Sequence, residues 1–254
     1  MTLPKTPSFS LKGKKALVVG ASSGIGSACA VALAEHGASV TLAARRKDRL
    51  ITLADKMSKK NWDTNILEMN IANVEETSRL ISGCEQFDIL VNSAGLARHS
   101  KSLDTSVEDF DTVMNINLKG AYFLTQAVAK KLLSMGKTGS LINISSQMGL
   151  VGGQERAVYC SSKHAVEGFT KAMAIEYGPA NIRVNTICPT FILTDMTKAT
   201  FDDPEKRAWV ESKIKLGRVG AVQDIMGAVV YLASDASSLV TGSALLIDGG
   251  WTAG

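Results

Sequence analysis

The sequence is poor in the residues that build disulfide frameworks and metal sites. Its 254 residues include only four cysteines, Cys29, Cys84, Cys160 and Cys188, which lie far apart and form no CxxC pair. Disulfides and a zinc site are therefore not expected, and this usage fits free thiols in a reducing cytosol. The three histidines are scattered and complete no metal-binding constellation, so we expect no bound metal.

Long apolar runs and a strong excess of one charge are also missing. No stretch approaches the length that spans a bilayer, and the first residues, MTLPKTPSFSLKGKK, lack the apolar core of an export signal. We therefore expect a cytoplasmic protein that does not bind membranes. Lys and Arg number 28 against 24 Asp and Glu, and the net charge of +4 is spread along the chain. A nucleic-acid partner is not expected.

What is present is a regular alternation of short β-branched runs and longer amphipathic segments. Near-continuous apolar strands that alternate with helices are typical of a parallel sheet covered on both faces. No linker rich in Pro, Gly or Ser divides the chain. We predict an α/β fold over residues 1–254: a single doubly wound domain with a seven-stranded parallel sheet and helices on both faces. The expected strands are 16–20, 39–44, 64–70, 88–95, 139–145, 182–188 and 244–248.

One segment interrupts this alternation. After Pro189 the sequence TFILTDMTKATFDDPEKRAWVESKIKLGRVG fits neither strand nor core helix. We predict a substrate lid over about 190–218.

The first expected strand ends in the glycine-rich sequence GASSGIG, in which Gly20, Gly24 and Gly26 follow the spacing GxxxGxG. Glycines allow a tight turn and close approach of a ligand, and the helix that follows offers free N–H groups to a pyrophosphate. The hydroxyls of Ser22 and Ser23 can donate to phosphate oxygens. This turn in the first strand–helix unit predicts a Rossmann-type nucleotide site.

The second expected strand ends at Ala44 and is followed by Arg45 and Arg46. NAD-specific folds place a carboxylate near this position, on the ribose 2′-hydroxyl. Here no carboxylate would repel a 2′-phosphate, and two guanidiniums could bind one. We predict that NADP(H) is preferred over NAD(H), with Arg45 the stronger candidate because it lies nearer the strand end.

Six sequence blocks occur in an order that resembles the short-chain dehydrogenase/reductase family, classical type. They are GASSGIG (20–26), NSAG (92–95), NINLKG (115–120), NISS (143–146), YCSSK (159–163) and CPTFILT (188–194), and LLIDGGW (245–251) resembles the family's last strand. The resemblance covers nearly the whole chain. It implies an NAD(P)-dependent oxidoreductase that acts on CH–OH groups.

The chemistry that the resemblance implies can be reconstructed from two residues. Tyr159 and Lys163 are one helical turn apart and face the same way. An ammonium beside a phenol favours the phenolate, so we expect Lys163 to lower the pKa of Tyr159 toward the range useful for general acid–base catalysis. Tyr159 would then give a proton to a carbonyl oxygen, or take one from an alcohol, while the nicotinamide exchanges hydride with the carbon.

The resemblance also gives roles to residues around this pair. Ser146, thirteen positions before the tyrosine, would hydrogen-bond the same substrate oxygen, with Ser145 as the neighbour to consider. Lys163 would hold the nicotinamide ribose, and Asn117 would anchor a water that leads protons to this lysine. The alternative for Asn117 is a residue that distorts its helix by bonding its own backbone.

The cofactor contacts implied by the resemblance extend over both halves of the chain. They are Gly20, Ser22, Ser23, Gly24, Ile25, Gly26, Arg45, Arg46, Asn70, Ile71, Asn92, Ala94, Gly95, Tyr159, Lys163, Pro189, Ile192 and Thr194. Two positions depart from the family pattern. Asn70 stands where an aspartate often touches adenine, and Thr190 replaces the usual glycine after the proline. We expect the first to alter detail and the second to reshape the pocket near the nicotinamide.

The expected substrate wall mixes apolar and polar side chains. Its predicted members are Ser146, Met148, Gln154, Arg156 and Leu193, with Gln147 and Arg98 as further candidates and His99 at the rim. This lining fits a small polar ketone such as a sugar acid or polyol, or a keto group on a longer chain. Two alternatives stay open: a 3-oxoacyl-carrier-protein reductase, which needs a basic patch for its acidic carrier, and a dinucleotide-binding sensor without turnover.

Relatives in the family are usually tetramers built on two long helices, here about 107–136 and 156–178. Both carry apolar side chains on more than one face, and such helices need partners. The positions are Tyr122, Phe123, Val128, Phe169, Met173 and Ile175. We expect a homotetramer.

Overall fold

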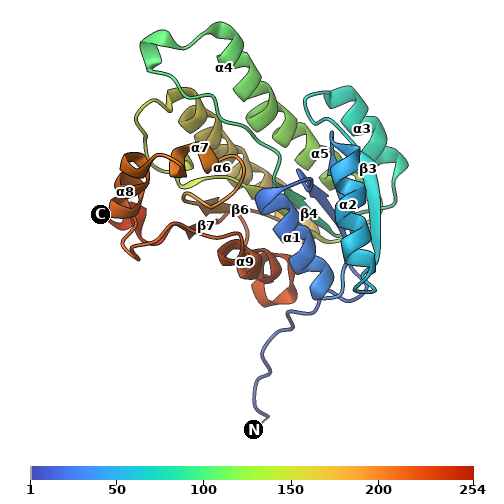
Figure 1. Ribbon diagram of the computed structural model, residues 1–254. Helices are drawn as coiled ribbons and strands as arrows, with labels where there is room; N and C mark the ends of the chain where they lie inside the picture. The colour runs from blue at the N-terminus through green and yellow to red at the C-terminus, as the bar shows by residue number, and fades with distance from the viewer. Residues whose placement is uncertain (1) are drawn as a thin grey trace.

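The computed structural model describes residues 2–254 and contains a seven-stranded, all-parallel sheet in the order β3-β2-β1-β4-β5-β6-β7 (Figure 1). The strands are β1 (Lys15–Val19), β2 (Ser39–Ala44), β3 (Thr64–Glu68), β4 (Ile89–Asn92), β5 (Gly139–Ile144), β6 (Ile182–Pro189) and β7 (Ala244–Ile247). The predicted fold class is confirmed. Each expected strand exists, and the largest differences are at the ends of β3 and β4, where the chain leaves the sheet earlier than the apolar pattern indicated.

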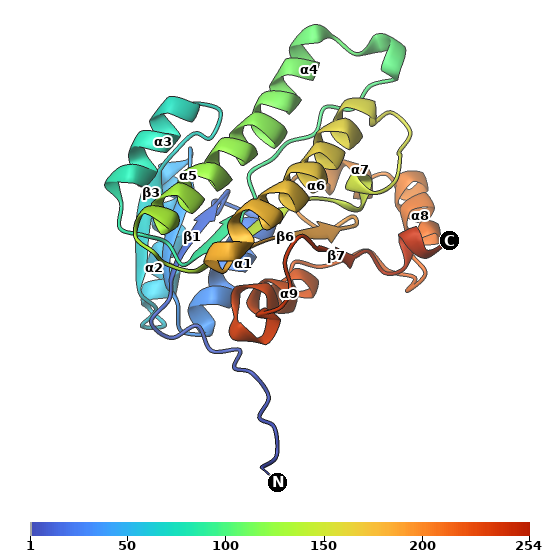
Figure 2. The same ribbon diagram turned by 180° about the vertical axis from the view of Figure 1, so that it is seen from behind.

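Helices cover both faces of the sheet because its strands are apolar on both sides. The helices are α1 (Gly24–Glu35), α2 (Lys47–Ser58), α3 (Val74–Gly83), α4 (Val107–Met114), α5 (Ala121–Ser134), α6 (Ala157–Tyr177), α7 (Lys198–Phe201), α8 (Pro204–Lys213) and α9 (Gln223–Ala233). Helices α1, α2 and α9 share one core cluster with the sheet, through Leu33, Leu50 and Val229. Helices α3, α5 and α6 share another on the opposite face (Figure 2), through Ile81, Leu124 and Phe169. Each such buried side chain contributes about 1.5–3 kcal/mol.

The strand order reverses direction between β1 and β4. Val19, the last residue of β1, pairs with Ala43 of β2 on one side and with Asn92 of β4 on the other. The first two crossovers, from β1 to β2 and from β2 to β3, therefore run to one side of β1 and the later ones to the other side, which opens a crevice beyond the carboxyl ends of these strands. Open α/β sheets bind their ligands at such a point.

The predicted helix over 107–136 is not continuous. Between α4 and α5 the chain forms a wider π-helical turn, Asn115–Gly120. At its end Gly120 packs against the backbone of Ile71, where a Cβ atom would lie 2.8 Å from the carbonyl oxygen. Single π-turns inside helices are frequent at functional sites, and this one contains Asn117. The amphipathic sequence pattern over 107–136 gave no sign of the extra residue in this turn.

The segment predicted as a lid over 190–218 contains α7 and α8. It has a small core of its own, in which Val210, Ile214 and Val219 are buried against Phe191 and Trp251. This core is separate from the two clusters that flank the sheet, so the segment packs as an added layer beside β6 and β7 (Figure 1). Across residues 2–254, no helix combines the length and apolar character needed to cross a membrane.

Candidate active site

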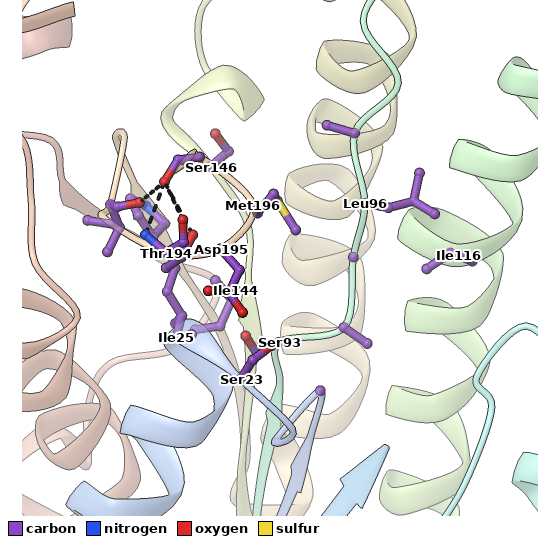
Figure 3. A pocket seen from close by; sticks show the side chains of 18 of the residues that line it. Ser23, Ile25, Ser93, Leu96, Ile116, Ile144, Ser146, Thr194, Asp195 and Met196 are labelled. Atoms are coloured by element: carbon purple, nitrogen blue, oxygen red, sulfur yellow. Dashed lines mark hydrogen bonds between the residues drawn. The ribbon is translucent and has the colours of Figure 1, made fainter. Parts of the chain in front are cut away.

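A cavity of about 360 Å³ lies at the carboxyl ends of the strands. Its walls come from the turn after β1, the ends of β2 and β3, the loop after β4, the end of β5, the start of α6 and the segment after β6. Figure 3 shows Ser23 and Ile25 of the first turn, Thr194 and Met196 of the segment after β6, and Ile116 of the π-helical turn. The cavity therefore joins segments that are far apart in the sequence.

The turn after β1 depends on glycine at two positions. Gly20 has a φ of +82°, and a Cβ atom there would lie 2.7 Å from the carbonyl carbon of Ser93. A Cβ on Gly26 would overlap the carbonyl oxygen of Gly20. Helix α1 begins at Gly24 after Ser23, whose side chain makes no capping hydrogen bond. The first N–H groups of α1 are thus left for a ligand, as a pyrophosphate site requires.

Two arginines lie at the end of β2 and line the same cavity. The Arg46 guanidinium donates through Nη2 to the hydroxyls of Ser22 at 2.7 Å and Ser23 at 3.0 Å. Neither Arg45 nor Arg46 forms an ion pair with any carboxylate of residues 2–254. Guanidiniums that no carboxylate of residues 2–254 neutralises, beside an uncapped helix N-terminus, could bind a dinucleotide that carries an additional phosphate. Arg46, rather than the favoured Arg45, contacts the serines of the turn.

Ser146, Tyr159 and Lys163 meet on the wall of the cavity. Ser146 follows β5, and its Oγ accepts a hydrogen bond from the backbone N–H of Met148 at 3.1 Å. The Lys163 ammonium donates to the carbonyl oxygen of Ile144 at 2.9 Å and lies 5.7 Å from the centre of the Tyr159 ring. Helix α6 places the tyrosine and the lysine on one face, one turn apart, as their spacing predicts.

The expected direction of the Tyr159 pKa is wrong for this structure. Burial raises the pKa of Tyr159 above its usual value of 10, although a hydrogen bond with Ser146 and the charge of Arg156 act in the opposite direction. Burial also lowers the pKa of Lys163 to about 8. Desolvation of both groups outweighs the attraction on which the prediction rested. Tyr159 is therefore a neutral phenol, which is the proton-donating form.

Asn117 lies just outside the cavity lining, within the π-helical turn. Its Oδ1 accepts from the backbone N–H of Leu96 at 2.9 Å, and its Nδ2 donates to the Leu96 carbonyl at 2.8 Å and to Ser162 Oγ at 3.2 Å. It thus holds the loop after β4 instead of bonding its own backbone. A Cβ on Gly95 would lie 3.3 Å from Asn117 Oδ1 and 3.8 Å from Lys163 Nζ, so both groups border the same glycine.

The far end of the cavity is formed by polar and aromatic side chains. Arg156 Nη1 donates to His99 Nε2 at 2.6 Å, and the guanidinium carbon lies 5.2 Å above the ring of Phe191. Partial burial, followed by the charge of Arg156, lowers the pKa of His99 to about 4. The imidazole is therefore neutral near pH 7 and accepts from the guanidinium. Phe191 stacks on Trp251, with ring centres 5.7 Å apart.

Most of the predicted site residues line this cavity, but several do not. The predicted residues outside the lining are Gly26, Asn92, Asn117, Gln154 and Leu193. Gly26 and Asn92 act from behind it, since Asn92 Oδ1 accepts from the N–H of Ala94 at 3.2 Å. Gln154 is exposed on a turn, and Leu193 is 47% exposed in the segment after β6. Arg98 is also outside, 3.6 Å from Asp109.

Some lining residues were missed by the sequence interpretation. They include Ile116, Asp195, Met196, Thr197 and Thr200. Thr197 Oγ1 donates to the carbonyl of Ile192 at 2.6 Å and accepts from the N–H of Thr194 at 3.1 Å, which fixes the start of the 190–218 segment. The only sequence signal was the polar TDMT run beside the predicted contact Thr194.

Comparison with known proteins identifies relatives over nearly the whole chain. The family model described as Enoyl-(Acyl carrier protein) reductase matches residues 20–252. D-Erythrulose reductase of Gallus gallus is 36% identical over 247 residues, covering 96% of this chain and 98% of that protein. The 3-oxoacyl-acyl-carrier-protein reductase FabG of Rickettsia felis is 38% identical over 240 residues, covering 94% and 97%.

A solved protein structure is also similar to this chain in both sequence and fold. It is a protein of Agrobacterium tumefaciens described as a 2-deoxy-D-gluconate 3-dehydrogenase, with NADP bound. It is 40% identical and superposes with a TM-score of 0.92, over 98% of this chain and 100% of that one.

Proposed function

The chain belongs to the short-chain dehydrogenase/reductase family, classical type, and we propose that it is an NADP(H)-dependent oxidoreductase that interconverts a ketone and a secondary alcohol. The observation that carries this proposal is the meeting of Ser146, Tyr159 and Lys163 on one wall of a cavity whose other end fits a phosphorylated dinucleotide. The relatives are named as reductases and dehydrogenases of CH–OH groups.

The chain's own residues supply the proton and the orientation. When bound, the dinucleotide supplies the hydride for the carbonyl carbon, or accepts it from the alcohol. In reduction, the neutral phenol of Tyr159 gives its proton to the carbonyl oxygen, so that the added hydride and proton together make the alcohol. The Ser146 hydroxyl holds the same oxygen in place. Lys163, buried beneath the tyrosine, provides the charge that stabilises the phenolate left behind.

The preference for NADP(H) rests on the arginines at the end of β2. In our proposal the guanidiniums of Arg45 and Arg46 bind the 2′-phosphate, and the hydroxyls of Ser22 and Ser23 complete the site. The contact of Arg46 with both hydroxyls supports this arrangement. The absence of an ion pair between either arginine and a carboxylate of residues 2–254 supports it as well. NADP is also the dinucleotide in the similar Agrobacterium tumefaciens structure.

The substrate we propose is a small polyhydroxylated ketone or its alcohol. The Gallus gallus relative is a D-erythrulose reductase, and the Agrobacterium tumefaciens protein is described as acting on a deoxygluconate. The mixed lining of this cavity, with His99, Gln147 and Arg156 beside apolar Met148 and Phe191, supports the same class.

A panel of ketoses, polyols and sugar acids, with NADPH and NADH absorbance followed in parallel, tests the proposal. We expect turnover of at least one polyhydroxylated compound, faster with the phosphorylated cofactor. No turnover of any compound with either cofactor would contradict it and would favour the dinucleotide sensor.

A second candidate is a 3-oxoacyl-carrier-protein reductase, which the similarity to the Rickettsia felis enzyme favours. Acetoacetyl-coenzyme A is a suitable probe, since it carries the keto group on the same thioester as the carrier-bound substrate. Its turnover at a higher kcat/KM than every polyhydroxylated compound would select this candidate instead.

We also propose a homotetramer built on α4, α5 and α6, located in the cytoplasm. Apolar side chains remain on the outer surface of these helices, where Phe110 is 44%, Leu133 45% and Ile175 79% exposed. Covering such side chains with a second copy of the chain would remove them from water. Sedimentation equilibrium gives the mass of the assembly directly, and a monomer would contradict the proposal.

A further inference from the structure

The substrate end of the cavity contains a cation that has no anionic partner within residues 2–254. Arg156 is half-buried on the wall that also bears Tyr159, and it forms no ion pair anywhere in residues 2–254. Its neighbour Glu155 is exposed on the preceding turn. A guanidinium that is partly removed from water without a carboxylate is costly, so such a group is typically completed by an anionic ligand.

The guanidinium is held in place, yet most of its donors are unused. Only Nη1 has an acceptor within the described chain, and that acceptor is the imidazole of His99. Phe191 supports one face of the guanidinium plane from 5.2 Å. The loop of His99 is tied to the loop of Arg156 by a hydrogen bond from the Ser100 N–H to the Glu155 carbonyl at 3.2 Å. The remaining N–H groups on Nη2 and Nε form a fork that matches the two oxygens of a carboxylate.

A second group on this wall also lacks a partner. The side chain of Gln147 is 1% exposed, and neither its Nε2 nor its Oε1 makes a hydrogen bond within residues 2–254. Gln147 lines the cavity directly after Ser146. A buried amide needs one acceptor and one donor, and a single hydroxyl group can act as both.

We propose that the substrate is a sugar acid, with its carboxylate bound by Arg156, one of its hydroxyls bound by Gln147, and its reacting carbon beside Ser146 and Tyr159. The inference rests on the oxidoreductase function proposed above and narrows its substrate class. An uncharged polyol would satisfy the amide but would leave the guanidinium without its anion. This end of the cavity should therefore select a negatively charged substrate over an uncharged one.

The test compares matched six-carbon compounds that differ only at the terminal carbon. Gluconate, galactonate and mannonate are assayed with NADP⁺ beside glucitol, galactitol and mannitol. We expect at least one sugar acid to exceed its polyol in kcat/KM by about tenfold or more, because a charge-assisted bidentate contact is lost with the polyol. Equal or better turnover of all three polyols would overturn the inference and leave the oxidoreductase function intact. Turnover of none of the six, and of no compound in the wider panel, would overturn both.

Variants at residue 156 separate substrate binding from an effect on the neighbouring tyrosine. Arg156→Gln is expected to lower kcat/KM for the preferred sugar acid by about 10- to 100-fold, and for its polyol by less than about threefold. Arg156→Lys keeps the positive charge but loses the two-pronged hydrogen-bonding geometry. Its kcat/KM for the sugar acid should therefore lie between those of the wild type and of Arg156→Gln. Arg98→Gln is the matched control, since Arg98 is exposed and outside the cavity, and both substrates should be unaffected. Equal losses for acid and polyol in Arg156→Gln would contradict the proposal.

Binding provides a readout that does not depend on turnover. With NADP⁺ present, the preferred sugar acid should raise the unfolding midpoint of the wild-type protein and of Arg98→Gln, but not that of Arg156→Gln. An identical rise in all three proteins would show that Arg156 does not bind the carboxylate. Gln147→Leu is expected to weaken the binding of the sugar acid and of its matched polyol by a similar factor, because both compounds offer a hydroxyl to the amide.

Discussion

The two ends of the cavity are built in different ways. The cofactor end is formed by one continuous piece of backbone, the turn from Gly20 into α1, together with two arginines that follow the next strand. The substrate end is formed by side chains from three separate segments, represented by His99, Arg156 and Phe191. Backbone geometry thus forms the pyrophosphate turn of the first end, to which the two arginines add charge, whereas the second end is formed by side-chain charge and shape alone. A family can keep the former and change substrate through the latter.

The largest effect is expected where the backbone itself is the binding site. Gly20→Ala places a Cβ 2.7 Å from the Ser93 carbonyl carbon at a φ of +82°. The left-handed conformation costs about 1–2 kcal/mol and overpacking adds about 1–3 kcal/mol. Chemical denaturation should show this loss, and NADP(H) affinity should fall with it.

Gly83→Ala is the matched control for this glycine. Gly83 is exposed at the end of α3, and a Cβ there would meet no atom within 4 Å. Its free energy of unfolding should change by no more than about 0.5 kcal/mol. An unchanged stability and cofactor affinity in Gly20→Ala would show that the turn does not need its glycine.

Lys163 lies where the two ends of the cavity meet, and its burial makes stability depend on pH. Its pKa falls from 10.5 to about 8 on folding. Between these values the unfolded chain binds a proton that the folded chain does not, so stability rises with pH, by about 1.4 kcal/mol per unit. Below about pH 8 both states are protonated and the slope vanishes.

The measurement is the free energy of unfolding against pH for the wild type and Lys163→Met. Burial also raises the pKa of Cys29 to about 12, which makes stability fall as pH rises above 9 in both proteins. The difference between the two proteins removes that contribution. If the difference in free energy of unfolding between wild type and Lys163→Met stays constant from pH 8 to pH 10, the pKa of about 8 for Lys163 is contradicted.

Substitution of the arginines at the end of β2 should change the relative use of NADP⁺ and NAD⁺ and have little other effect. Arg46→Gln is expected to lower kcat/KM for NADP⁺ by about 10- to 100-fold, because it removes charged hydrogen bonds, and to leave NAD⁺ within about twofold. Arg45→Gln, assayed beside it, shows whether the second guanidinium contributes equally. Lys47→Gln removes an exposed charge from the same region without touching the cavity. Equal losses for both cofactors would argue against a 2′-phosphate site.

The smallest effect distinguishes two neighbouring side chains of the 190–218 segment. Phe191 lines the cavity and stacks on Trp251, whereas Leu193 is half exposed outside it. Phe191→Ala should raise KM for the substrate by roughly tenfold, since it removes an aromatic wall and its packing. Leu193→Ala should change KM by less than about twofold. The reverse order would restore Leu193 as the substrate contact expected from the sequence.

The comparison also explains what could be predicted from the sequence. Strands β1 to β7 were predicted because short runs rich in β-branched and apolar residues alternate with longer amphipathic segments. The glycine turn was predicted because its chemistry is local. The substrate end could not be predicted in the same way. Gln154 and Leu193 are close in sequence to true lining residues, yet their side chains point elsewhere. Which side of a loop faces the cavity depends on tertiary packing.

Two further differences between the prediction and the structure also arise from tertiary packing. The π-helical turn that carries Asn117 depends on contact of Gly120 with Ile71, which no local pattern reveals. The raised pKa of Tyr159 depends on how deeply α6 is covered, whereas the spacing to Lys163 reports only that the two side chains are neighbours.

The most direct test of the whole account is Tyr159→Phe, measured in two ways on one preparation. With the preferred substrate, kcat should fall by about 100- to 10,000-fold, because the proton donor is gone. NADPH binding, followed by fluorescence titration, should stay within about twofold of the wild type, because the glycine turn and the arginines are untouched. Undiminished turnover in this variant would contradict the account.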